Sequence, residues 1–177
     1  MRGRQDIYIN ILDDVKLSQQ ELLSYANELS LIHKVYAKNM EFRHINLAEA
    51  RASVENAYAA AKRDKYKGLE LPAISEWFYD NRYLFIEQIK QIGLNKSPFR
   101  LPQIKNGPFA GLPRSFVLAA ELARHSSFYI TVASIREFLE AYQRETELDS
   151  GELWVFADML KAAILCAVSE LAKYSVE

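Results

Sequence analysis

The sequence predicts an all-α fold of about six helices, with a long proline- and glycine-rich connector between the third and the fourth. All five prolines lie between Pro72 and Pro113, which leaves long proline-free stretches that suit helices. Apolar residues in those stretches recur every three or four positions, as on one face of a helix. At 177 residues we expect one helical domain over residues 18–177, preceded by an N-terminal arm over residues 1–17.

The first two helices begin at capping patterns. Ser18 and Glu21 have the spacing of a capping box, in which each side chain binds the other residue's backbone amide. An apolar stripe at helical spacing extends this helix to about residue 36: Leu22, Ala26, Leu29, Ile32 and Tyr36. Asn46 and Glu49 start the second helix in the same way. It passes through an alanine-rich segment that permits close packing and stops near Gly68.

Prolines mark the start of the third and fourth helices. Pro72 lies in the first turn of the third helix, where the missing amide costs nothing, and Gly93 ends this helix. The fourth helix begins at Pro113 for the same reason and runs to about His125.

Small polar residues start the last two helices. The fifth follows Thr131 or Ser134 and ends near residue 146. The sixth opens at Asp149 or Ser150, with an acidic residue in its positive first turn, and reaches about Tyr174 as a long central helix.

The connector over residues 94–112 is long for a compact domain, and loops of this length tend to be functional or disordered. We expect an ordered strap, because apolar residues that can anchor it recur among the prolines: Phe99, Leu101, Ile104, Phe109 and Leu112. Arg100, Asn106 and Arg114 on this strap are the best place to expect specific contacts.

The N-terminal arm contains one candidate strand. Ile7, Ile9 and Ile11 alternate with polar residues, as in a short strand, although an extra helical turn or a docking arm fits equally well. No second strand is indicated elsewhere in the sequence.

Composition argues against several partners. A net charge of −1 gives no overall attraction to nucleic acid or to an anionic membrane. The most apolar segment, residues 153–172, is interrupted by Asp158 and Lys161, so we expect a buried helix and no direct membrane span. Cys166 lies in this segment and is the only cysteine, which excludes an intramolecular disulfide and indicates a small buried hydrophobe.

No cofactor or metal is expected. His33, His44 and His125 are scattered, and no two of them have ligand spacing. Gly107 and Gly111 superficially suggest a phosphate-binding loop, but no Lys-Ser/Thr pair follows them and prolines remove backbone donors.

The third helix carries two amides at the edge of its apolar face, Asn81 and Gln88. An amide that faces a core needs partners, because burying it unpaired costs roughly 1–3 kcal/mol. We interpret both as bound to backbone in the connector. The alternative is recognition of sugar hydroxyl groups.

A second stripe on this helix places carboxylates beside an aromatic ring, as in the active site of a glycosidase. Its residues are Glu76, Asp80, Tyr83 and Glu87. The simpler interpretation is a solvated face on which Arg82 and Lys90 form ordinary ion pairs.

Charged residues also gather on two other helices. Arg114, Glu121 and His125 share one face of the fourth helix, where Glu121 and His125 form either a structural pair or an acid–base pair. A basic cluster closes the second helix and fits the helix dipole better than binding of phosphate or acidic lipid: Lys62, Arg63, Lys65 and Lys67.

Short motifs between residues 70 and 170 resemble the helical N-terminal region of cyclic β-1,2-glucan synthases. Their order and separations carry the resemblance: EWFYDN at 76–81, EQI at 87–89, LP at 101–102, GP at 107–108, Gly111, PR at 113–114, YQ at 142–143 and GELW at 151–154.

The resemblance implies association with a glucosyltransferase that uses UDP-glucose at the cytoplasmic face of the inner membrane. The aspartate motifs and the QxxRW-type signature of that enzyme are absent from this sequence, so no active site carries over. We therefore expect a cytoplasmic, non-catalytic accessory domain. It would reach the inner-membrane face through a parent or partner protein, with a catalytic glucosyltransferase module in cis or in trans as its partner.

Two alternatives remain open at this stage, a carbohydrate-binding module that takes glucan and a small glycoside-processing enzyme with paired carboxylates. No residue is assigned a catalytic role. The candidate binding residues are Trp77, Asp80, Asn81, Glu87, Gln88, Arg114, Glu121, Tyr142, Glu152 and Trp154.

Overall fold

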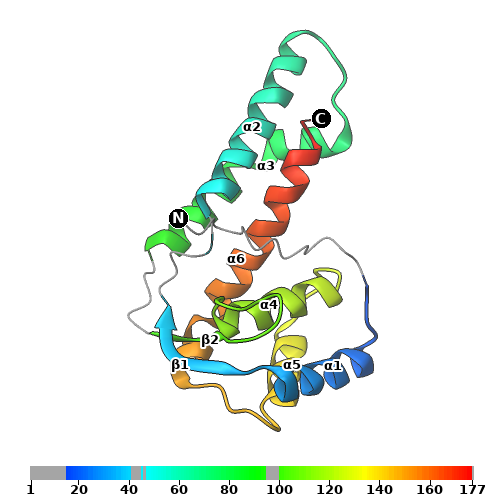
Figure 1. Ribbon diagram of the computed structural model, residues 1–177. Coiled ribbons are helices and arrows are strands. Elements are labelled where there is room, and N and C mark those ends of the chain that lie inside the picture. Colours follow the sequence, from blue (N-terminus) through cyan, green and yellow to red (C-terminus); the bar gives the residue numbers. More distant parts are fainter. Residues whose placement is uncertain (1–14, 41–44, 46, 95–99, 177) are drawn as a thin grey trace. The chain divides into compact units, whose positions relative to one another are not determined.

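The computed structural model describes residues 15–40, 45, 47–94 and 100–176. The candidate strand at residues 7–11 lies outside the described residues. In the part that the structure describes, the chain forms six helices and two strands, which confirms a mostly helical fold (Figure 1). The elements, in order, are α1 (Gln19–Ile32), β1 (Val35–Met40), α2 (Leu47–Tyr66), α3 (Ala73–Leu94), β2 (Leu101–Ile104), α4 (Arg114–His125), α5 (Val132–Tyr142) and α6 (Ser150–Tyr174).

The chain divides into two compact units. The first comprises Met1–His44 with Ser97–Leu160, and the second comprises Ile45–Lys96 with Lys161–Glu177. Each unit therefore combines segments that are distant in the sequence. The single domain expected over residues 18–177 stays a prediction.

The helix starts expected at Ser18 and Thr131 are confirmed by their hydrogen bonds, whereas Asn46, expected to start the second helix, lies outside the described residues. Ser18 forms a capping box with Glu21, and Thr131 forms one with Ser134, whose amide lies 3.1 Å from the threonine hydroxyl. Pro113 is the N-cap residue of α4. The second helix ends as expected, because Gly68 adopts a left-handed conformation (φ = 73°) that glycine accepts without strain.

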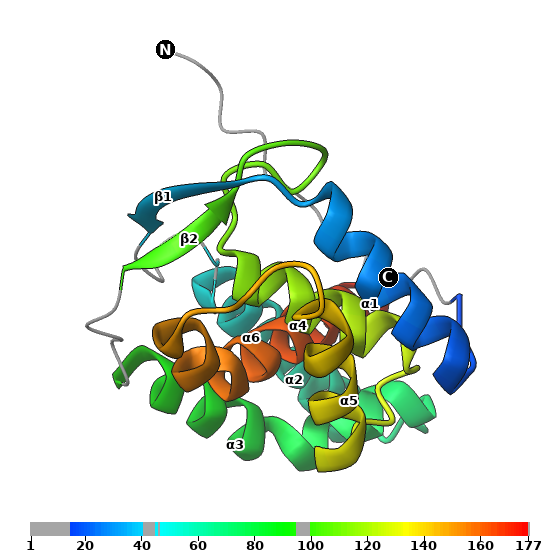
Figure 2. The same ribbon diagram turned by 90° about the horizontal axis from the view of Figure 1, so that it is seen from below.

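A two-stranded antiparallel sheet is the feature that the sequence expectations missed. Strand β1 pairs with β2 in the register Val35 to Ile104 and Tyr36 to Gln103 (Figure 2). The first helix therefore ends at Ile32 and does not continue to Tyr36, which corrects the expected apolar stripe.

The side chain of Asn106 explains why α1 stops. Its Nδ2 donates to the carbonyl oxygen of Ile32 over 3.0 Å, and its Oδ1 accepts from the amide of Lys34 over 2.9 Å. The two contacts bind backbone groups that a longer helix would use, and they lead the chain into an extended conformation at His33.

The core of the first unit surrounds α4. Buried apolar side chains occupy nearly its whole length: Phe116, Val117, Leu118, Ala119, Ala120, Leu122 and Ala123. In the same unit, α1 packs against α5. A helix that is buried on nearly all sides needs partners for its polar side chains inside the protein, and among the described residues Ser115 Oγ is a buried group of α4 without one.

In the second unit, α2 packs against α3 (Figure 1). Ala50, Ala57 and Ala61 are buried along α2, consistent with the close approach expected of alanine. The rings of Tyr58 and Tyr79 stack with centroids 5.4 Å apart. No helix in the described part of the chain is long and apolar enough to cross a membrane.

Candidate functional site

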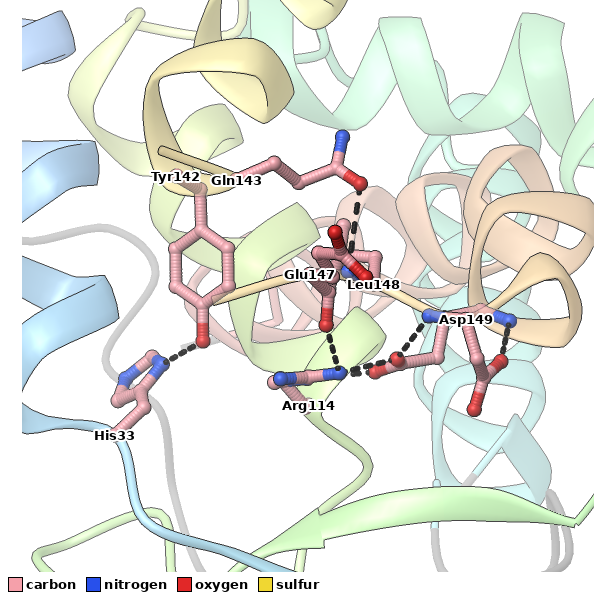
Figure 3. Close-up of polar contacts among 8 residues, drawn as sticks. His33, Arg114, Tyr142, Gln143, Glu147, Leu148 and Asp149 are labelled. Atoms are coloured by element: carbon pink, nitrogen blue, oxygen red, sulfur yellow. Dashed lines mark hydrogen bonds and ion pairs between the residues drawn. The ribbon is translucent and has the colours of Figure 1, made fainter. Parts of the chain in front are cut away.

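The first unit contains a buried ion pair between Arg114, the first residue of α4, and Glu152 near the start of α6 (Figure 3). Arg114 Nε donates to Glu152 Oε1 over 2.8 Å, and Arg114 Nη2 donates to Glu152 Oε2. The pair is therefore bidentate, the strongest geometry available to a guanidinium and a carboxylate. Only 4% of Arg114 and none of Glu152 is exposed to solvent.

Glu152 also closes the first turn of α6. Its Oε2 accepts the amide of Asp149 over 3.0 Å, and its own amide donates to Asp149 Oδ1 over 2.8 Å. The carboxylate thus accepts three N–H groups, which compensates for its complete burial. This reciprocal cap explains why the helix begins at Ser150, as the sequence predicted.

Arg114 is held in place from the loop before α6 as well. Its Nη2 donates to the carbonyl oxygen of Glu147 over 3.1 Å. Burial disfavours the charge on Arg114, but the hydrogen bonds and negative charge of Glu152 outweigh burial and raise the pKa of the guanidinium. In the same loop, Gln143 Oε1 accepts the amide of Leu148 over 3.3 Å.

Tyr142, the last residue of α5, extends the cluster towards the end of α1. Its ring centroid lies 5.9 Å from Arg114 Cζ, and its hydroxyl lies 3.2 Å from Nδ1 of His33 (Figure 3). Burial, followed by the positive charge of Arg114, lowers the pKa of His33 to about 4. Burial raises the pKa of Tyr142. At neutral pH both groups are therefore uncharged, and the tautomer of the imidazole decides which of them donates this hydrogen bond.

The cluster joins the end of α1 and the start of α4 to the end of α5 and the start of α6. Its four charged or ionisable side chains contact one another, so the carboxylate of Glu152 is not a free acid or base. This arrangement suits a structural framework better than general acid–base catalysis. The sequence identified Arg114, Tyr142 and Glu152 but missed His33, which had been considered only as a metal ligand.

A second buried cluster in this unit contains the predicted Glu121–His125 pair. Glu121 Oε2 lies 3.2 Å from His125 Nε2, which confirms that the two side chains touch. Tyr25 of α1 donates its hydroxyl to the same oxygen over 2.7 Å. Glu121 is 1% exposed and His125 is 7% exposed. Nothing in the sequence pointed to Tyr25.

The candidate residues on α3 lie in the second unit and are more exposed than those of the two buried clusters. Trp77 is 44% exposed, and its ring packs against Phe85 with centroids 5.0 Å apart. Asn81 Nδ2 donates to the carbonyl oxygen of Trp77 over 2.9 Å. The amide thus reaches a carbonyl one turn back in its own helix, and the expected bond from Asn81 to the connector stays a prediction.

The acidic stripe on α3 faces solvent. Glu76 and Asp80 are exposed, and Glu87 forms an ion pair with Lys90 over 2.8 Å. Gln88 is half-buried. Carboxylates on an open helix face lack the enclosed cleft that glycosidases use to place two acids about a sugar.

Trp154, the last residue of the GELW motif, is 77% exposed on α6. A single exposed apolar side chain is common on protein surfaces, so this exposure alone assigns no function to Trp154. Across the described ranges, no three His, Cys, Asp or Glu side chains are grouped as metal ligands.

Comparison with known proteins finds one distant similarity. No family model matches the chain, and no solved structure matches it. The cyclic β-(1,2)-glucan synthase NdvB of Rhizobium meliloti (strain 1021) is 24% identical over 119 residues. This alignment covers 66% of the chain but 4% of the synthase, so the chain spans a small fraction of the curated relative it matches. The similarity supports a distant relation to that enzyme.

Proposed function

We propose that this chain is a non-catalytic helical module that supports the glucosyltransferase of a cyclic β-1,2-glucan synthase-like protein, either within one polypeptide or as a separate subunit. The distant similarity to NdvB favours the relation. The ion pair between Arg114 and Glu152 carries the non-catalytic part of the proposal.

Three of the short motifs that resemble the synthases meet at that ion pair. Arg114 comes from PR, Tyr142 from YQ and Glu152 from GELW, and all three side chains are buried. Their polar atoms are bound to one another and to the α5–α6 loop. Residues that hold helix ends together would recur in a scaffold, whereas residues that act on a substrate need an accessible surface.

A chimeric synthase tests the proposal. The segment of NdvB that aligns with this chain is replaced by the chain, and glucan formation from UDP-glucose is measured in membranes. We expect the chimera to form glucan and a synthase with the segment deleted to lose most of this activity. The purified chain alone should form none.

The control for this experiment is a chimera that carries an unrelated helical domain of similar length, which should behave like the deletion. Full activity of the deletion, or glucan synthesis by the isolated chain, would contradict the proposal. The cellular location that we propose, the cytoplasmic side of the inner membrane, depends on the same partner.

A second candidate function is carbohydrate binding, and the exposure of Trp77 favours it. The indole packs against the tilted ring of Phe85, at an interplanar angle of 57°, so its exposed aromatic surface is held in place and loses little entropy when a ligand binds. Titration with β-1,2-glucan should quench tryptophan fluorescence in the wild-type chain and in Trp154→Phe, but not in Trp77→Phe. An unchanged signal in the wild-type chain would rule out this function.

A further inference from the structure

His125 has more hydrogen-bond acceptors around its ring than a neutral imidazole can serve. Its Nδ1 lies 2.8 Å from the carbonyl oxygen of Val15, and its Nε2 lies 3.2 Å from Glu121 Oε2. A carbonyl oxygen and an ionised carboxylate both accept only. A neutral imidazole has one N–H group, so both contacts require either an imidazolium beside the carboxylate or a proton on Glu121. In each case the pair carries one proton more than a neutral histidine beside an ionised glutamate would carry.

The surroundings of Glu121 favour the ionised carboxylate. Tyr25 donates to its Oε2 over 2.7 Å, and Arg124 Nη1 lies 4.0 Å from its Oε1. Burial, then the hydrogen bond to Glu121, raises the pKa of Tyr25, so this phenol stays a donor throughout the neutral range. The extra proton therefore belongs on the ring of His125.

In the described part of the chain, the backbone of residues 15–17 is hydrogen-bonded to α4 through His125. Val15 offers its carbonyl oxygen to the ring, and the amide of Leu17 donates to the carbonyl oxygen of His125 over 3.0 Å. We propose that the proton shared by His125 and Glu121 fastens Val15 to the end of α4, and that loss of this proton releases Val15 while the backbone bond of Leu17 persists.

The direction of the release follows from the strengths of the two contacts. After deprotonation one N–H remains on the ring. A hydrogen bond to an ionised carboxylate is roughly twice as strong as one to a neutral carbonyl, so the remaining proton stays between Nε2 and Glu121. The lone pair on Nδ1 then faces the carbonyl oxygen of Val15, and this contact becomes repulsive.

The groups that face His125 come from three segments. Helix α1 supplies Tyr25, whose ring meets the imidazole edge-on with centroids 4.7 Å apart, and Glu28, whose charge acts on Tyr25. Helix α4 supplies Glu121 and Arg124, and the N-terminal segment supplies the Val15 carbonyl. Arg124 opposes the imidazolium by like charge, whereas Glu121 favours it.

Release would alter a surface as well as a contact. Leu17 and Tyr25 both line a shallow depression along α1, whose other lining residues include Glu21 and Glu28. The amide of Leu17 stays bound to the carbonyl oxygen of His125. Release of Val15 therefore loosens the chain at the edge of this depression and leaves Leu17 in its wall.

Nuclear magnetic resonance on the whole chain tests this proton-dependent contact between Val15 and His125. The ring nitrogen shifts of His125 and the amide shifts of Lys16 and Leu17 are followed from pH 5 to pH 9. We expect both ring nitrogens to carry protons at the acid end. A single transition should remove the proton from Nδ1 and move the two amides with the same midpoint.

Two variants sharpen the result. His125→Gln should abolish the transition in the amides of Lys16 and Leu17, and trypsin should cleave after Lys16 several times faster than in the wild type at pH 7. His33→Gln, which changes the other described histidine of this unit, should leave the transition intact. The proposal would be overturned if the ring of His125 carried one proton over the whole pH range. It would also be overturned if the amide shifts of Lys16 and Leu17 did not change with the ring nitrogen shifts. Both outcomes can be read from the wild-type chain even if His125→Gln fails to fold.

Discussion

The carboxylate of Glu152 binds both Nε and Nη2 of Arg114 while it caps the helix to which it belongs. One side chain therefore fixes the start of α6 and neutralises the first residue of α4. Neither charge has access to solvent, so each depends on the other for its solvation.

Removing one partner of this pair should be much more harmful than removing both. Glu152→Gln leaves a buried guanidinium without its counter-charge, and we expect a loss of about 3–5 kcal/mol in the free energy of unfolding. The double variant Arg114→Met with Glu152→Leu should lose less than either single change. Urea denaturation followed by circular dichroism measures these differences.

The ion pair between Arg82 and Glu55 provides the matched control. Its Nε–Oε2 distance is 2.7 Å, but the side chains are 38% and 31% exposed. Solvent already screens these charges, so Arg82→Met should cost no more than about 1 kcal/mol. Equal losses in Glu152→Gln and Arg82→Met would show that burial does not control the strength of the buried pair.

Helix positions could be predicted because their signals are local. Three helix starts are indicated by a residue and its capping partner less than four positions away, at Ser18, Thr131 and Asp149. The structure confirms all three. The sheet could not be predicted, because β1 and β2 are separated by about sixty residues and Pro102 weakens the strand signal of β2. The end of α1 depends on Asn106, which lies 74 residues from Ile32 in the sequence.

The candidate site was predictable only in part, for the same reason. Arg114, Tyr142 and Glu152 were named from short motifs, but no spacing rule could pair them. Tyr25 of α1 and His33, which follows that helix, join buried clusters, but the sequence of this segment showed only a capping box and an apolar stripe. Partners across a core are chosen by packing, and packing leaves no local pattern in the sequence.

The stability of the protein should fall when His33 must take up a proton. The ordinary pKa of 6.5 describes the unfolded chain, whereas burial and then Arg114 lower the folded value to about 4. Between these values the unfolded state binds more protons, so stability decreases as pH falls from about 6.5 to about 4. The slope that His33 contributes is at most about 1.4 kcal/mol per pH unit.

His33→Gln isolates this contribution. Glutamine can accept the Tyr142 hydroxyl but does not titrate, so the variant should show a shallower decline in stability over the same interval. Chemical denaturation at half-unit steps from pH 4 to pH 7 supplies both curves, and other titrating groups cancel in their difference. Parallel curves would mean that His33 is not buried as a neutral ring.

The N-terminal cap of α5 should contribute more to the free energy of unfolding than a solvent-exposed hydroxyl inside a helix does. The hydroxyl of Thr131 accepts the amide of Ser134, one of the donors that a helix start leaves unpaired. Thr131→Ala should lower the free energy of unfolding by about 0.5–2 kcal/mol. Ser24→Ala, at an exposed position within α1, should be neutral or slightly stabilising. The same urea titration compares the two, and equal effects would contradict the assigned cap.

Cys166 should react slowly with iodoacetamide, because only the thiolate is a nucleophile. Burial, followed by the negative charges of Glu170 and Glu49, raises the pKa of its thiol to about 11 from an ordinary 9.0. At pH 8 both values lie above the solution pH, so the two-unit difference lowers the thiolate fraction about 100-fold relative to the unfolded chain. Alkylation followed by mass spectrometry, in buffer and in urea, measures the ratio. The folded rate should rise roughly tenfold per pH unit up to pH 10, and a folded rate that equals the unfolded rate at pH 8 would show that Cys166 is a reactive surface thiol.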